Sequence, residues 1–357
     1  MKKFNCYLFV IILCAANSFA ASFTTLDNYM NWNQGISGAM VSDDASTIFI
    51  SYGSGGRALW KLGVVTYPNV SFSDMTPDGS ILMGTNSGQV FTYQSGTINY
   101  LGNGTGWDIS ADGTVIGGKN TSVHGQGQAC IWVNGTRQDL GFLSSEHYYS
   151  QVSDISSNGQ TVIGFSRPSY YFEGGTMPFI WSGTNMEPLP AVAGVEEWMP
   201  RAISSDGTTV AGTFYNGSRY EACMYSDGST TPLGIPDGYI SSLLCDLTAN
   251  GSIAVGWCGL ANYDYEAVIW DEFNGIQSLK TFLEDEWGLT LTGWTLENAY
   301  GISEDGTMIY GNGQDPEGHY TYWIAEVPEP AAILLFGIGG VVLIKNQRNG
   351  RRKQQII

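Results

Sequence analysis

The sequence predicts an all-β fold, a seven-bladed β-propeller, from a repeated unit, its turns and the match between its two ends. Each unit contains an apolar strand, an Asx-Gly turn, a second strand with a glycine six residues after the Asx, and a later strand with an aromatic end. About four strands in roughly 35–55 residues is the size of a propeller blade.

The turns define the repeat. Glycine after Asn or Asp supplies the positive φ of a two-residue hairpin turn, and the flanking segments alternate as strands do. Six turns carry their Asx at Asp78, Asp112, Asn158, Asp206, Asn250 and Asp305. A seventh, degenerate copy is Ser-Asp43-Asp44-Ala45.

Two further positions recur along the repeat, a glycine in six units and an aromatic residue in all seven. The glycine in the second strand indicates close backbone approach, as at a crowded axis, and the aromatic residue suits packing between sheets. The glycines are Gly84, Gly118, Gly164, Gly212, Gly256 and Gly311. The aromatic residues are Trp60, Tyr93, Trp132, Trp181, Tyr225, Trp270 and Trp323.

The ends of the repeat region match. The last unit stops at Ile324 without a fourth strand, and residues 23–29 look like that missing strand. Pairing them closes a propeller over residues 21–326 and removes the exposed sheet edge. Six blades are one alternative, because the first two units are short and the first lacks its Gly turn; an open β-solenoid is the other. One insertion, residues 278–288, has helical spacing and predicts a short helix packed on the propeller.

Charge restricts the partners. Residues 21–330 hold all 33 acidic residues but only eight basic ones, a net charge of about −25. Such a surface repels nucleic acid and anionic lipid and favours divalent cations.

The N-terminus predicts export. Residues 1–20 combine two lysines, an apolar helical core and small residues at −3 and −1, Ser18 and Ala20. This pattern is typical of a signal peptide that the Sec machinery exports and signal peptidase cleaves after Ala20.

The C-terminus has three parts, over residues 327–353. Val327-Pro328-Glu329-Pro330 precedes an apolar run, 331–344, and a basic tail of Lys345, Arg348, Arg351, Arg352 and Lys353. As a transmembrane helix the run covers about 21 Å of a ~30 Å hydrocarbon core, which suits a transient stop with a cytoplasmic tail. A plain single-span anchor is the alternative.

This ending resembles the PEP-CTERM sorting signal. The resemblance implies recognition by an exosortase, a membrane-embedded cysteine protease of Gram-negative bacteria, which removes the tail and passes the protein to the cell surface or matrix. The body resembles the HAF repeats of bacterial extracellular proteins, most closely at 288–294 and 299–307. That family often carries PEP-CTERM tails and has no established catalytic residues. Thr76-Pro77 and the eroded first turn depart from its pattern.

Four carboxylates share one register, four residues before the Asx: Asp74, Asp108, Asp154 and Asp246. The same register holds Ala202 and Gly301 in two other units. If it lines the central channel, the carboxylates would hold Ca²⁺ or act as acid and base on a polysaccharide. The favoured interpretation is structural, with each side chain capping its own turn, because a structural need recurs along a repeat.

Other groups carry weaker hypotheses. No cofactor motif or metal-ligand pattern is present, and the three histidines fall in loop-like stretches. Tyrosines at 148–149, 170–171 and 263–265 would bind sugars if they share a face, since rings stack on sugars, but loop packing is favoured. Cys245 and Cys258 flank a hairpin and are a candidate pair, whereas Cys130 and Cys223 suit buried positions.

Together these observations predict an exported, non-enzymatic surface or matrix protein whose propeller binds partners in the exopolysaccharide layer. The alternatives are an exported polysaccharide hydrolase or lyase that uses the channel carboxylates, and a bulk coat protein with little specific binding.

Overall fold

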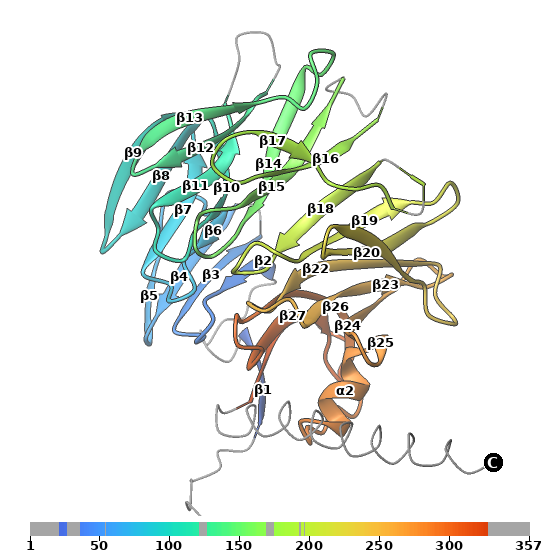
Figure 1. Ribbon diagram of the computed structural model, residues 1–357. Coiled ribbons are helices and arrows are strands. Elements are labelled where there is room, and N and C mark those ends of the chain that lie inside the picture. Colours follow the sequence, from blue (N-terminus) through green and yellow to red (C-terminus); the bar gives the residue numbers. More distant parts are fainter. Residues whose placement is uncertain are drawn as a thin grey trace, which may run out of the picture.

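The computed structural model describes residues 21–26, 36–53, 55–120, 127–168, 175–192, 194–195 and 197–327. Seven antiparallel sheets of four strands are arranged around a central axis (Figure 1). The first strand of blades 1 to 6 is innermost, and β26 takes that place in blade 7. The structure therefore confirms a seven-bladed propeller and excludes the six-bladed and solenoid alternatives.

The blades follow the chain order. Blade 1 contains β2 (Ile36–Val41), β3 (Thr47–Tyr52), β4 (Gly56–Lys61) and β5 (Val64–Thr66). Blade 2 contains β6 (Asp74–Met75), β7 (Ile81–Asn86), β8 (Gln89–Gln94) and β9 (Thr97–Asn103). Blade 3 contains β10 (Thr105–Ile109), β11 (Val115–Lys119), β12 (Ala129–Val133) and β13 (Thr136–Gly141). Blade 4 contains β14 (Tyr149–Ile155), β15 (Val162–Arg167), β16 (Met177–Trp181) and β17 (Met186–Pro188).

The remaining blades include the closure. Blade 5 contains β18 (Trp198–Ile203), β19 (Val210–Tyr215), β20 (Tyr220–Ser226) and β21 (Ser229–Gly234). Blade 6 contains β22 (Ser241–Leu247), β23 (Ile253–Gly259), β24 (Tyr265–Asp271) and β25 (Gly275–Ser278). Blade 7 contains β26 (Thr295–Ile302), β27 (Met308–Gln314), β28 (Tyr320–Glu326) and, from the other end of the chain, β1 (Ser22–Thr25).

The Asx-Gly turns are longer than the sequence analysis predicts. In blade 2, Thr76 N donates to Ile81 O, which leaves four residues in the loop, and Gly79 N donates to Thr76 O. Only Gly79 has positive φ, +60°. The Asp78 carboxylate accepts hydrogen bonds from the Thr76 hydroxyl and the Ser80 amide at 2.6 and 2.9 Å. The Asx therefore fixes the turn through its side chain rather than through a left-handed backbone.

The recurring second-strand glycine faces a β-bulge. A Cβ on Gly118 would lie 2.0 Å from Thr105 O on the paired innermost strand, and the register there shifts between Gly106 and Asp108. Blade 1 has Ile50 at the equivalent position, paired with Ala39. Its bulge lies nearer the start of β2, between Ile36 and Gly38. Close backbone approach is confirmed, but the glycine approaches its own blade's bulge and not the propeller axis.

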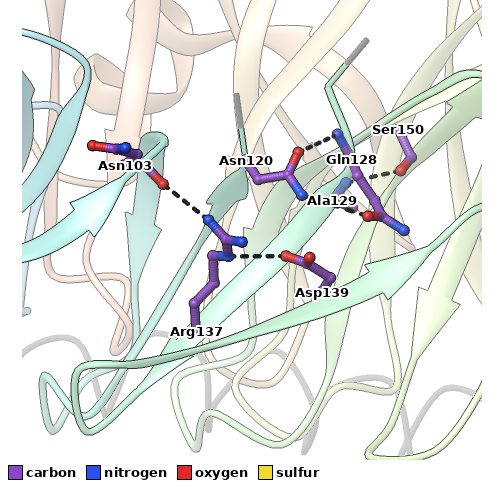
Figure 2. A network of polar contacts seen from close by, with 7 residues as sticks. All are labelled: Asn103, Asn120, Gln128, Ala129, Arg137, Asp139 and Ser150. Carbon is purple, nitrogen blue, oxygen red and sulfur yellow. Dashed lines mark hydrogen bonds and ion pairs between the residues drawn. The ribbon is translucent and has the colours of Figure 1, made fainter. Parts of the chain in front are cut away.

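Polar contacts join neighbouring blades at their edges. Figure 2 shows Ser150, at the start of blade 4, accepting a hydrogen bond from Ala129 N of blade 3 at 2.8 Å. In the same view Arg137 of blade 3 donates to Asn103 O of blade 2 at 3.4 Å. Ser242 repeats the Ser150 contact between blades 5 and 6, accepting from Ala222 N at 2.9 Å.

The predicted helix and cysteine positions have mixed outcomes. Helix α2 (Leu279–Asp285) buries Leu279 and Leu283 against blades 6 and 7, as predicted. Cys130 and Cys223 are buried, as predicted. The Cys245–Cys258 pair was wrong: both are free thiols, because Cys258 lies opposite Ser242 and Cys245 occupies a bulge.

Candidate functional site

The four register carboxylates bind the next blade. Each carboxylate accepts a hydrogen bond from a backbone amide of the next innermost strand. That amide belongs to the residue directly after the same register position in the next blade. The pairs are Asp74 with Ile109 N (3.0 Å), Asp108 with Ile155 N (2.5 Å), Asp154 with Ile203 N (2.7 Å) and Asp246 with Ile302 N (2.9 Å). An innermost strand has one edge without a ladder partner, so these carboxylates satisfy buried amides that no strand reaches.

Neither sequence interpretation describes this arrangement fully. The carboxylates do converge near the axis, but the interpretation that each caps its own turn was wrong, because that contact belongs to the Asx residue. Two of these carboxylates also accept from the amide that follows them in their own strand: Ile155 N donates to Asp154 Oδ1 at 2.9 Å, and Leu247 N donates to Asp246 Oδ1 at 2.8 Å. The acidic residue therefore acts first as a connector between blades.

Burial controls the charge of these groups. It raises the pKa of Asp246 to about 7 and of Asp154 to about 6. Asp108 lies between Asp74 and Asp154, and burial together with repulsion from both raises its pKa well above the ordinary value. Asp108 also hydrogen-bonds to both carboxyl groups, and because an ionised carboxylate cannot donate, these contacts require protons that are shared among the three groups.

A small cavity remains on the side where blades 1 and 7 lack the Asp. It has a volume of about 130 Å³, and Asp43, Asp74, Asp246 and Tyr310 contribute polar groups to its lining. The Tyr310 ring occupies the space beside Gly301, where an added Cβ would lie 2.3 Å from Cε1. Ligand pockets usually have roughly 300–1,000 Å³, so this cavity is too small for a sugar chain.

A second ring, which sequence reasoning missed, lies one residue before each Asx. Asp43 N donates to Pro77 O at 2.8 Å, and Ala249 N donates to Glu304 O at 2.9 Å. The Glu304 carboxylate of blade 7 accepts from the hydroxyls of Ser157 in blade 4 and Ser205 in blade 5. Neither of these blades is adjacent to blade 7. Its amide donates to Asp43 Oδ2 at 2.8 Å. Glu304 thus crosses the axis at the face of the Asx turns.

The opposite face carries the tyrosines. Because strands alternate in direction, the loops between second and third strands and the connections between blades all lie there. Tyr148 and Tyr263 are exposed at 54% and 88% of their surface. Tyr149 is buried beneath the Arg167 guanidinium, which lies 4.5 Å from its ring centroid. Tyr170, Tyr171 and Phe172 lie outside the described residues.

Blade 7 adds a cluster that the sequence did not suggest. Tyr300 occupies the bulge of β26, and Tyr320 and Tyr322 lie on β28. Buried Asn312 of β27 donates its amide to the hydroxyls of Tyr300, at 2.8 Å, and Tyr320. The available signal was the place of Tyr300, directly before the register position of Gly301.

One group on this face has the composition of a metal site. Asp315, Glu317 and His319 share the β27–β28 loop, with ligand atoms within 4.8 Å of one another. Asp315 already accepts from the His319 backbone amide at 2.7 Å and pairs with its ring at 3.2 Å. These contacts within the loop explain why the three side chains lie close together.

The sorting residues are only partly described. Val327 is buried, and its amide donates to Thr307 O at 2.8 Å, so it belongs to the propeller. The other predicted processing and membrane residues lie outside the described residues: Ser18, Ala20, Pro328, Glu329, Pro330, Lys345, Arg348, Arg351, Arg352 and Lys353. Within the described part of the chain, no helix has the length and apolarity to cross a membrane.

Comparison with known proteins finds similarity in structure only. No family model and no curated protein matches the sequence, so the HAF and PEP-CTERM resemblances stay predictions. TolB from Acinetobacter baumannii is 13% identical, with 65% of this chain matched to 60% of that chain and a TM-score of 0.41. This chain therefore spans less than two thirds of that protein.

Two other solved structures are similar at the same level. The β-propeller domain of the Trilobed protease from Pyrococcus furiosus is 14% identical, over 68% of this chain and 83% of that one, with a TM-score of 0.49. Putative TolB from Agrobacterium tumefaciens is 12% identical, over 86% and 97%, with a TM-score of 0.40. The propeller assignment rests on the seven sheets and their registers.

Proposed function

We propose that this chain is an exported, non-enzymatic protein of the cell surface or extracellular matrix. An exosortase sorts it after transient anchoring in the inner membrane, and its propeller binds partners in the exopolysaccharide layer. The supporting sequence features are the signal peptide over 1–20 and the three-part ending over 327–353.

One observation carries the proposal. Ser22 pairs with Glu326 across β1 and β28, so all seven sheets lie between the two predicted processing sites. Signal peptidase would cut just before β1, and an exosortase would cut at or after the motif that follows β28. Removal of both terminal segments takes no strand from the ring.

The arrangement of the carboxylates supports a binding role over catalysis. Asp74, Asp108, Asp154 and Asp246 are engaged with backbone amides of the next blade. A general acid or base must reach its substrate within hydrogen-bond distance. The small cavity beside these groups gives a polysaccharide chain no such approach.

Mass spectrometry of the mature protein tests the sorting proposal. In a strain with an exosortase we expect a surface or extracellular protein that starts at Ala21 and has lost residues 331–357. In the matched exosortase deletion, the tail should be retained in the membrane fraction. An intact chain in the cytosol of both strains would contradict export. Release of reducing ends from a polysaccharide, lost in Asp154→Asn, would favour the hydrolase alternative.

A further inference from the structure

The tyrosine cluster of blade 7 has a rigid support. Asn312 is 1% exposed, and its side-chain oxygen accepts from Asn298 Nδ2 at 2.8 Å while its amide nitrogen donates to Tyr300 and Tyr320. Both ends of the amide are thereby occupied. The two hydroxyls are held by one buried side chain, which fixes the rings to which they belong.

Ring packing supports the same positions. Tyr322 is 5% exposed, and Tyr300 stacks on it with centroids 6.0 Å apart and planes at 24°. Tyr320 meets Tyr322 edge-on at 6.3 Å and 89°. Tyr300 and Tyr320 nevertheless stay 37% and 51% exposed. Immobile, half-exposed tyrosines offer contact area at a small entropic cost on binding.

The position of the cluster favours a ligand that crosses the propeller face. Tyr300 lies at the bulge of the innermost strand β26, one residue further from the Asx turns than the carboxylate register. The same bulge position holds Cys245 in blade 6 and Arg201 in blade 5. The cluster thus begins on the innermost strand of blade 7 and extends outward to Tyr320 on β28.

The chemistry of the site fits an uncharged sugar. Burial raises the pKa of both Tyr300 and Tyr320, so each hydroxyl keeps its proton. Gln314 Nε2 donates to Glu297 Oε1 at 2.9 Å on the same strand pair and adds amide and carboxylate groups that hydrogen-bond hydroxyls. The net charge of about −25 over residues 21–330 disfavours a polyanion.

We propose that Tyr300 and Tyr320, positioned by Asn312, bind a neutral saccharide unit of a polysaccharide. The rings stack on the apolar face of the sugar, and the fixed hydroxyls hydrogen-bond its rim. This inference rests on the proposed function and names the ligand class of its binding face.

Affinity electrophoresis of the full-length chain tests this site. The protein is kept in a zwitterionic detergent, because the headgroups of a sugar-based detergent would compete for the site. It then runs through gels that contain dextran, galactomannan, xyloglucan or alginate. We expect at least one neutral polymer to retard it and alginate to leave it unretarded. Tyr300→Ala and Tyr320→Ala should each weaken the association about threefold to tenfold. Asn312→Ala should weaken it without removing a ring.

The matched control is Tyr263→Ala, since Tyr263 is 88% exposed on the same face but outside the cluster. Melting curves establish that each variant is folded, and Tyr320→Ala, the most exposed change in the cluster, serves if Tyr300→Ala unfolds. Retardation by none of the neutral polymers, or equal weakening by Tyr263→Ala, overturns the proposal. A wild-type protein that is sorted correctly yet binds no neutral polymer overturns this site and leaves the proposed sorting intact.

Discussion

Ser22 is the Cα partner of Glu326, and its hydroxyl donates to Glu326 Oε2 at 3.3 Å. The two residues are 304 positions apart in the sequence, yet they lie opposite each other on neighbouring strands of one sheet. Blade 7 is therefore the only blade, among those the structure describes, that joins both ends of the repeat region. Its closing strand is β1 (Ser22–Thr25), which begins one residue earlier than predicted, and residues 27–29 lie outside the described residues.

Phe23→Ala should weaken the closed ring. Phe23 stacks on Trp323 with centroids 5.7 Å apart and meets Trp294 edge-on at 4.9 Å. Loss of these contacts should lower the free energy of unfolding by about 2–3 kcal/mol, measured by urea denaturation. Phe273→Ala, at a residue that is 76% exposed, should change it by less than about 0.5 kcal/mol. Equal stability of both variants would mean that β1 does not close the ring in solution.

Gly164→Ala should disrupt the bulge of blade 4. The added Cβ would lie 2.1 Å from Gln151 O and 2.6 Å from the Phe179 ring, and backbone cannot yield as a flexible side chain can. We expect a loss of about 3 kcal/mol or more in thermal or urea unfolding, within the range of overpacked cores. At Gly175 the same change meets only Glu197 Oε1 at 3.4 Å and should be nearly neutral. A tolerated Gly164→Ala would refute the link between the glycine and the bulge.

Ala45→Gly and Gly79→Ala should change the melting temperature by different amounts. Ala45 occupies the turn position of the glycines with φ +52°, a conformation that costs an L-residue about 1–2 kcal/mol. Ala45→Gly relieves that strain but loses a buried methyl and loosens the unfolded chain, so the melting temperature should change by only a few degrees. Gly79→Ala adds a Cβ 2.4 Å from Thr47 of blade 1 and should lower it clearly. Similar melting of the two variants would contradict this difference.

The repeat could be predicted because each of its signals is local. The Asx-Gly turn, the glycine after it and the aromatic residue all lie within one blade, and closure follows from a strand missing at one end. The partner of Asp74 could not be predicted, because Ile109 lies 35 positions away in the next blade. Glu304 reaches Ser157 over 147 positions. Contacts of this kind depend on how the ring closes, which the pattern of one blade does not contain.

The site residues show the same difference between signals that are local in the sequence and contacts that are not. The tyrosine clusters were identified as runs of adjacent residues, but adjacent residues need not share an environment. Tyr149 is the first residue of β14 and is buried, whereas Tyr148 precedes the strand and is exposed. The cluster of Tyr300 and Tyr320 comes from two strands and a buried Asn312, and no run of residues marks it. A bulge, which the pattern of alternation does not reveal, sets the direction of Tyr300.

Stability should fall as pH rises from 5 to 8. Burial raises the pKa of Asp246 to about 7, above the ordinary 3.8, so the native protein holds a proton there that the unfolded chain releases. The stabilising contribution of this group is complete below about pH 4 and is lost as pH rises through 7, on the order of 4 kcal/mol in all. Asp43 and Asp154, with pKa values raised to about 6, act in the same direction.

Asp246→Asn tests this pH dependence directly. The amide oxygen of Asn still accepts the hydrogen bond from Ile302 N but does not titrate, so the variant should lose less melting temperature between pH 5 and pH 8 than the wild type. Part of the slope should remain, because Asp154 still titrates. Asp206→Asn is the control: hydrogen bonds from Thr208 lower the pKa of Asp206, so its contribution is already constant above pH 5. If Asp206→Asn flattens the profile as much as Asp246→Asn does, the buried carboxylates are not its cause.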